Sequence, residues 1–268
     1  MPVAVLLVEG ELDEQVLVGL KPPGLVLERG GSKGSLQSAT RERRKKLVSA
    51  CYLRDRDFDF DPPADLLVPT LDATDGQTRP LGWRWCRHEM ESYLLEPSLV
   101  ARATAWPVSD YTAALLTAAH ELRYYTAARW AVGIARRSLP PFCELPTRPA
   151  GLTNEIKLPD NCSEVTCDGW AHGQVAAFFS QIATHLTADA IFASLVERKQ
   201  RLAALRKAHE ILLWHSGKDL LAALSGSLPG AFKGHPKIFV RALRDWVQEN
   251  PQLTLEIFPE WRAPCLSS

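Results

Sequence analysis

Short apolar runs alternate with helix-like segments over the first hundred residues. The run from Val3 to Val8 is continuously apolar, which is typical of a strand covered on both faces. A helical segment over 12–20 follows it and ends at Pro22, Pro23 and Gly24. Further strands are predicted at 25–27, 48–53 and 83–87, a polar, basic helix at 35–47, and a polar connection at 61–80. This alternation predicts an α/β fold with a mainly parallel sheet flanked by helices.

The pattern becomes helical from about residue 97. Apolar periodicity predicts one helix over 111–137 and further helices between 174 and 213, with a Pro-rich irregular stretch over 139–168 between them. Two more helices are predicted at 218–224 and 236–249. We therefore expect an α/β core over 1–98, a large helical insertion over 99–213, and a C-terminal helical segment over 214–268 that packs back on the core.

Composition and charge narrow the function classes. The chain has 268 residues, of which 46% are hydrophobic, and this is enough to bury a core and excludes disorder as a description of the whole chain. Lys and Arg together number 31, as do Asp and Glu, so nucleic-acid binding would need a local basic patch. The longest apolar runs are strand-sized, so we expect no membrane span, no signal peptide and a cytoplasmic location.

The cysteines point to no zinc site. Six are scattered along the chain without a Cys-x-x-Cys or a paired Cys/His spacing, which favours reduced thiols. Cys162 and Cys167 are the only pair to test for metal binding. The Gly-rich stretch at 30–34 and the Gly217-Lys218 pair do not fit a Walker A loop, so any ATP hydrolysis would come from another chain.

Acidic residues follow three of the predicted strands. They are Glu9 with Asp13, Asp55 with Asp57, and Glu89 with Glu91. In an open α/β sheet the carboxyl ends of the strands share one crevice, so these side chains should converge. Asp13 lies about one turn along if a helix begins at once, and the two-residue spacing of each later pair aims both side chains to one side if the chain stays extended.

Gathered carboxylates repel one another unless a cation neutralises them, and oxygen ligands suit Mg²⁺ or Mn²⁺. With several carboxylates available, a two-ion site is feasible. The alternative is that single acids such as those in Arg-Asp-Arg-Asp are exposed ion-pairing residues, and that Glu91 favours a helix start. That alternative explains less well why Glu9, Asp55 and Glu89 each close a separate strand.

Basic residues flank the predicted acidic site in sequence. The candidates for binding a phosphate backbone are Lys33, Arg43, Arg44, Lys45, Arg54 and Arg56. Lys33 is favoured because its Gly-rich loop allows close approach to a phosphate. For the run from Arg43 to Lys46, a solvated helix face is an equal alternative.

At this point the chain resembles a TOPRIM domain. The motifs, in chain order, are Glu9-Gly10 with Asp13, Gly-Gly-Ser-Lys at 30–33, Asp55-Arg56-Asp57, and Glu-Met-Glu-Ser-Tyr-Leu-Leu at 89–95. The last is similar to the Glu-x-Glu-Asn-Tyr-Leu of OLD-family nucleases and of the small TOPRIM effectors of PARIS-type phage-defence systems, with Ser92 in place of the usual Asn. The resemblance covers about residues 3–98 and resumes at 215–221, which looks like the Gly-Lys segment of those nucleases.

This resemblance implies an endonuclease that depends on Mg²⁺ or Mn²⁺, with one or two ions. Glu9, Asp13, Asp55 and Asp57 would be metal ligands, with Glu89 or Glu91 completing the site. Glu9, Asp55, Asp57 and Lys218 would be the catalytic residues, Lys218 steadying negative charge in the transition state. The implied partners are DNA or RNA, including tRNA, a separate ABC-type ATPase and a second copy of the chain. A primase-like nucleotidyl transferase and a non-catalytic TOPRIM interaction module are the alternatives.

Overall fold

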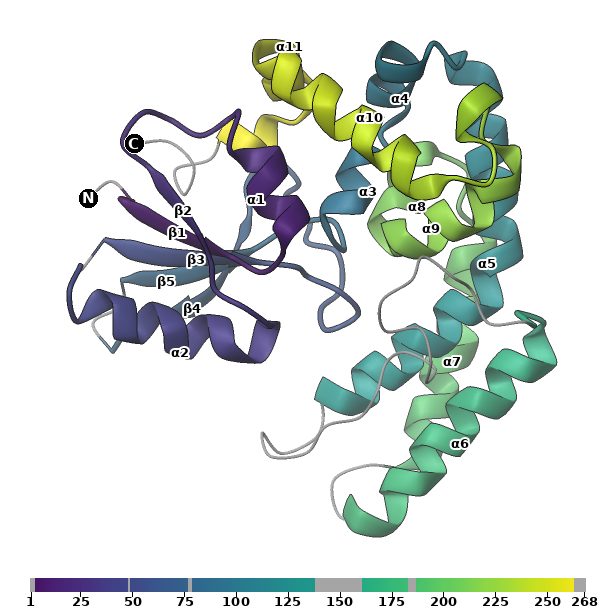
Figure 1. Cartoon of the computed structure of the whole chain (residues 1–268). Coiled ribbons are helices and arrows are strands. Elements are labelled where there is room, and N and C mark those ends of the chain that lie inside the picture. The colour runs from purple at the N-terminus through teal and green to yellow at the C-terminus, as the bar shows by residue number, and fades with distance from the viewer. Residues whose placement is uncertain (1–2, 48, 77–78, 138–160, 183–186, 263–268) are drawn as a thin grey trace. The chain divides into compact units, whose positions relative to one another are not determined.

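The computed structural model describes residues 3–47, 49–76, 79–137, 161–182 and 187–262 (Figure 1). The chain divides into two compact units. The α/β unit comprises Met1–Arg56, Pro62–Ala105 and Phe239–Ser268, and the helical unit comprises Asp57–Asp61 and Trp106–Ile238. Among the described residues, none of the helices combines the length and hydrophobicity that crossing a membrane requires.

The sheet of the α/β unit has five strands in the order β2-β1-β3-β5-β4. They are β1 (Val5–Val8), β2 (Val26–Arg29), β3 (Ala50–Arg54), β4 (Thr70–Thr74) and β5 (Pro80–Arg84). β1 pairs in parallel with β2 and β3, and β3 pairs in parallel with β5, whereas β4 is antiparallel to β5. The prediction of a mainly parallel α/β sheet is therefore confirmed. β1 and most of β3 are fully buried, as their continuous apolar runs indicated.

Strand β4 corrects the sequence prediction, which placed a polar connection over 61–80. Its sequence, Thr-Leu-Asp-Ala-Thr, lacks an apolar run because it forms the edge of the sheet. Its central residue, Asp72, accepts hydrogen bonds from the Tyr52 hydroxyl at 2.6 Å and from Arg84 Nη1 at 3.1 Å. Neighbouring strands therefore satisfy a polar residue that, in the sequence alone, indicates a loop.

The helices of the α/β unit are α1 (Glu11–Leu17), α2 (Lys33–Arg44), α3 (Met90–Leu94), α4 (Pro97–Thr104), α11 (Pro251–Ile257) and all but the first turn of α10 (Pro236–Glu249), with a 3₁₀ turn, η3, at Pro259–Arg262. Leu36 of α2 packs into a core with Val5, Leu7, Tyr52 and Leu81. α10 contacts α1, since Gln248 Nε2 donates to the Gln15 carbonyl at 2.7 Å.

The helical unit is built around the long helix α5 (Val108–Arg137), visible in teal in Figure 1. Helices α6 (Glu164–Ile182), α7 (Ala188–Ala203), α8 (Ala208–Trp214) and α9 (Gly217–Leu224) each contact it. Short 3₁₀ turns follow at Ser225–Ser227 and Gly230–Phe232. The irregular stretch predicted over 139–168 is wrong at its end, because α6 begins at Glu164; residues 138–160 lie outside the described part of the chain.

The units do not follow the three segments expected from the sequence. α4 belongs to the α/β unit because it contacts α11, so this unit continues past residue 98. The helical unit continues past residue 213, because α9 contacts α5. The segment 214–268 is therefore divided between the two units at Ile238.

A five-residue piece of the N-terminal half, Asp57–Asp61, belongs to the helical unit. The Phe58 ring meets Trp130 edge-on, with 5.2 Å between the ring centroids. Gly133 makes this approach possible, since a Cβ atom there would lie 2.4 Å from the Phe58 carbonyl oxygen. Asp61 Oδ2 accepts from Arg198 Nη2 at 3.1 Å. Helices α5 and α7 thus hold the residues that directly follow Asp55-Arg56.

Candidate functional site

The three central strands of the sheet carry the acidic residues at their carboxyl ends. Val8 of β1 is in register with Leu53 of β3, which is in register with Trp83 of β5. Glu9 directly follows β1, and Asp55 directly follows β3. Glu89 comes after the turn that leaves β5 and is the N-cap residue of α3. Adjacent parallel strands therefore deliver these acids to one edge of the sheet.

Glu9 and Asp55 are in contact. The backbone N–H of Asp55 donates a hydrogen bond to Glu9 Oε2 at 3.4 Å. Asp55 is 8% exposed and Glu89 3% exposed. Buried carboxylates at one edge of a sheet are stabilised by a cation, because burial disfavours the charged form and neighbouring negative charges repel. The structure thus brings Glu9 and Asp55 together as the centre of the candidate site.

Asp13 is the third residue of α1, which begins directly after Gly10 and so meets the condition for placing Asp13 about one turn beyond Glu9. Its Oδ2 accepts the Gly10 N–H at 3.1 Å, and a Cβ atom on Gly10 would lie 3.0 Å from the same oxygen. A carboxylate in this position satisfies a backbone donor at the helix start and interacts favourably with the helix dipole. This capping role accounts for its 5% exposure whether or not it also binds metal.

The expected same-side placement of the later pairs is wrong. Asp57 has φ 49°, in the left-handed region, so the extended conformation does not continue from Asp55 through Asp57. β5 ends at Arg84, before the end at residue 87 that the sequence predicts, and Glu91 lies in the first turn of α3 after the cap residue Glu89. Residues two apart on a helix do not face the same way. Glu89 is buried and Glu91 is half-buried.

Lys218 lies in the helical unit, as the second residue of α9. The helix is capped by Ser216, whose Oγ accepts the Asp219 N–H at 3.5 Å. Asp57 also belongs to the helical unit. The roles of Asp57 as a metal ligand and of Lys218 as a phosphate-facing cation therefore stay predictions.

His215, in the same segment, is fully buried, and burial lowers its pKa from 6.5 to about 4. The unfolded chain therefore binds a proton more readily than the folded chain below about pH 6.5. We expect the free energy of unfolding to fall between pH 6.5 and 4, by about 3 kcal/mol in total from this residue.

Chemical denaturation across this pH range measures the effect. His215→Leu should flatten the slope, whereas His209→Leu, at an exposed position on α8, should leave it unchanged. An unchanged slope in His215→Leu would contradict the assignment.

Two of the predicted phosphate-binding residues serve the fold instead. Arg44 Nε donates to the Ala50 carbonyl at 2.7 Å, and its Nη1 pairs with Asp75 at 2.8 Å. Arg56 is 0% exposed and donates from Nε to the Cys86 carbonyl at 2.9 Å. The Arg44 side chain thus connects β3 to the end of β4, and the Arg56 side chain connects the residues that follow β3 to those that follow β5.

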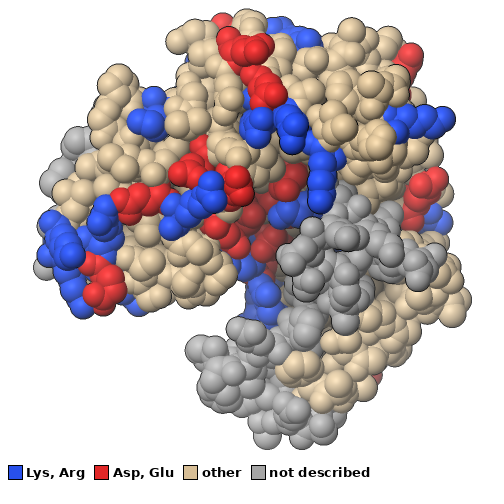
Figure 2. All heavy atoms as spheres, viewed as in Figure 1, with Lys and Arg blue, Asp and Glu red and all other residues tan. Residues whose placement is uncertain are grey.

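Of the other basic candidates, Lys45 is exposed and Lys33 and Arg43 are half-buried, whereas Arg54 is about as buried as Arg44. Lys33 is the first residue of α2, after Gly31 at φ 83°. Arg43 pairs with Glu28, Lys45 pairs with Glu42 at 2.7 Å, and Arg54 lies 3.8 Å from Asp72. On the face shown in Figure 2, blue and red side chains are correspondingly interspersed over the α/β unit. A phosphate contact by Arg43, Lys45 or Arg54 would compete with these ion pairs. The role of Lys33 stays a prediction from its Gly-rich loop.

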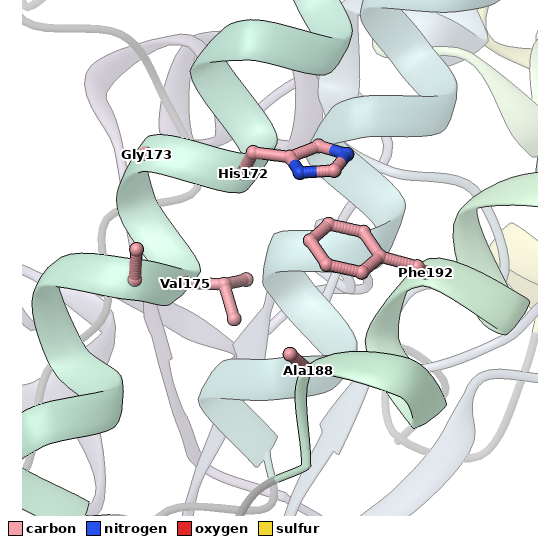
Figure 3. A pocket seen from close by; sticks show the side chains of 6 residues that line it. His172, Gly173, Val175, Ala188 and Phe192 are labelled. Carbon is pink, nitrogen blue, oxygen red and sulfur yellow. The ribbon is translucent and has the colours of Figure 1, made fainter.

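A pocket of about 510 Å³ lies between α6 and α7 in the helical unit (Figure 3). The His172 ring stacks on Phe192 with 3.6 Å between the centroids, and Val175 and Ala188 line the same space. Reaction sites combine an apolar lining with several convergent polar groups. Among the described residues lining this pocket, His172 is the one ionisable side chain, so we do not place the chemistry here.

The oxygen donors at the strand ends are of the type that a hard divalent cation prefers. Among the residues that the structure describes, no group of three or more His, Cys, Asp or Glu side chains has the spacing to hold a metal ion. Mg²⁺, however, commonly takes only one or two carboxylates and completes its shell with water and substrate phosphate. Glu9 and Asp55, in contact through the Asp55 backbone N–H, are the candidates for such a pair.

The cysteine pair is a poor metal site. Burial raises the pKa of the Cys162 thiol, and it raises the pKa of Cys167 to about 12. A thiol must lose its proton to bind metal, so burial disfavours this role.

One set of residues beside the site was not predicted from the sequence. Glu260 and Tyr93 form a buried hydrogen bond, and Glu260 also contacts the backbone of Cys86. No local motif marks Glu260; a lone acid between Pro259 and Trp261 near the C-terminus is the only signal.

Comparison of the chain with protein-family models and with curated proteins gave no match.

Proposed function

We propose that this chain is a divalent-metal-dependent nuclease that hydrolyses phosphodiester bonds of DNA or RNA. The observation that carries the proposal is the placement of Glu9, Asp55 and Glu89 after three adjacent parallel strands, with Glu9 and Asp55 in contact. The open end of a parallel sheet is where α/β proteins bind their ligands. The motif resemblance to TOPRIM nucleases supports the same reading.

In this proposal Glu9 and Asp55 hold Mg²⁺ or Mn²⁺, and Glu89 approaches from the turn after β5. The bound ion would lower the pKa of water and stabilise charge on the phosphate. Lys33, at the start of α2, would bind a neighbouring phosphate. The TOPRIM effectors that the motifs resemble work with a separate ABC-type ATPase, so we propose such a partner and a role in phage defence.

A cleavage assay on the purified full chain tests the proposal. Plasmid DNA, single-stranded DNA and tRNA are each incubated with Mg²⁺, with Mn²⁺ and with EDTA, alone and with an ABC-type ATPase encoded nearby. We expect cleavage of at least one substrate with metal, its loss in EDTA and its recovery when metal is restored. Cleavage that persists in EDTA, or none in any arm, would refute the proposal.

One observation favours a second candidate, a non-catalytic interaction module. In the described residues the acids do not form a three-donor group, which is also what a TOPRIM-like scaffold without chemistry would show. Calorimetric titration with Mn²⁺ separates the two. A nuclease should bind Mn²⁺ at a site that Asp55→Asn removes, whereas a scaffold should bind it weakly and equally in both proteins.

A further inference from the structure

The C-terminal segment of the α/β unit reaches the turn that carries Glu89. Glu260, in η3, is 3% exposed. Its Oε1 accepts the backbone N–H of Cys86 at 2.9 Å, and its Oε2 accepts the hydroxyl of Tyr93. Cys86 directly precedes the segment 87–92, and Tyr93 directly follows it. One carboxylate therefore binds both ends of this segment, which we call the Glu89 turn.

Arg87 ties the two ends together from inside the turn. Its backbone N–H donates to the Tyr93 hydroxyl oxygen at 3.2 Å, so this phenol is bound on both sides. Its guanidinium donates to the Ser92 carbonyl at 2.9 Å and to Glu96 at 2.6 Å. These bonds leave the conformation of the Glu89 turn dependent on a network that ends at Glu260.

The network lies in an aromatic cluster of Trp85, Tyr93, Phe258 and Trp261. The Trp261 ring lies 4.5 Å from Phe258 and 5.4 Å from Tyr93, measured between centroids. Burial in this cluster raises the pKa of Glu260, and the bonds from Tyr93 and Cys86 oppose that rise. A buried carboxylate is seldom the most stable choice for filling an apolar site. The two hydrogen bonds of Glu260 to the ends of the Glu89 turn indicate that this carboxylate holds the turn in place as well as filling space in the cluster.

We propose that Glu260 is a positioning residue that fixes the Glu89 turn for metal binding at the strand ends. The inference rests on the proposed function, since it assigns Glu89 to that metal site. It adds a residue outside all the recognised motifs, on a segment 167 positions away from Tyr93 in the chain.

The test compares Glu260→Gln and Tyr93→Phe with a matched control, Glu256→Gln, an exposed position on α11. Mn²⁺ affinity is measured by calorimetry, and activity is measured as a function of Mn²⁺ concentration. We expect Glu260→Gln to weaken Mn²⁺ binding by about 10- to 100-fold, as for other residues that orient a ligand. The Mn²⁺ concentration for half-maximal activity should rise equally, with kcat largely recovered at saturating metal.

Tyr93→Phe keeps the ring and removes the hydroxyl, which donates to Glu260 and accepts the Arg87 N–H. Glu260 keeps its bond to Cys86 in this variant, so we expect a smaller shift in the same direction. The variant also serves as the test if Glu260→Gln does not fold. A purely structural role would lower Tm without changing the Mn²⁺ affinity of the folded protein. That result would overturn the inference and leave the proposed function intact.

Amide hydrogen exchange tests the inference independently of activity. In Glu260→Gln we expect faster exchange confined to residues 87–93 and unchanged exchange in β1 and β3. If the wild-type chain neither binds Mn²⁺ nor cleaves, the proposed function fails, and with it the assignment of this turn to metal binding. If the wild type binds Mn²⁺ but exchange in the turn is unaffected by Glu260→Gln, the positioning role alone is refuted.

Discussion

Replacing Asp55 with asparagine is expected to abolish metal-dependent cleavage while the α/β unit stays folded. Asp55 directly follows β3 and is 8% exposed, and its backbone N–H donates to Glu9 Oε2. Asparagine keeps the shape of the side chain and removes its charge. The loss of activity should exceed the roughly 10- to 100-fold effect typical of residues that only orient a ligand.

The thermal midpoint separates a metal-site acid from a structural one. Without metal, Asp55→Asn should keep a Tm close to that of the wild type, because asparagine keeps the shape of the side chain and the backbone bond from Asp55 N–H to Glu9. Added Mn²⁺ should raise Tm in the wild type and not in the variant, since a ligand that binds only the folded state stabilises it. Asp65→Asn, at an exposed position in the same unit, is the control. Full cleavage by Asp55→Asn would refute its assignment.

Replacing Arg129 with methionine is expected to destabilise the helical unit by about 3–5 kcal/mol. Arg129 of α5 pairs with Asp219 of α9, and the two side chains are 5% and 3% exposed. Its guanidinium also lies over the Phe58 ring, 4.1 Å from the ring centroid. Methionine fills much of the space but leaves the Asp219 carboxylate buried without this cation. Denaturant unfolding followed by circular dichroism measures the loss.

The double variant Arg129→Met/Asp219→Leu shows whether the buried charge causes the loss. Removing both ions avoids an uncompensated carboxylate, so we expect most of the stability to return. Arg29→Met, which breaks an exposed pair with Glu14, should leave the unfolding midpoint unchanged. A double variant as unstable as Arg129→Met would show that lost packing against Phe58 dominates.

The central strands were predictable because a short run of apolar residues indicates a buried strand without information from elsewhere in the chain. β1 is apolar throughout and β3 is apolar up to its last residue, Arg54, and the acid that follows each strand marks the edge of the sheet. The pairing of Glu9 with Asp55 then follows from parallel neighbours alone. Edge strand β4 lacks this signal, because the partners of its Asp72 lie on other strands.

The remaining features depend on contacts that no local pattern records. The extended chain ends before Asp57, and the residues on either side of it are both buried, in different units. Arg56 donates a hydrogen bond to Cys86 in the α/β unit, whereas Phe58 packs on Trp130 in the helical unit. The division of the chain into units and the role of Glu260 likewise rest on residues far apart in sequence.

The discontinuity of the α/β unit has a consequence during synthesis. Tyr93 leaves the ribosome long before Glu260, with which it bonds across 167 positions. At about 5–20 residues per second, the interval is roughly 10–30 s. The nascent sheet can therefore form its strand pairs early, but the Glu89 turn is secured only once translation has passed η3. In the proposed nuclease, the Glu89 turn would thus be fixed for metal binding only after α11 and η3 have emerged.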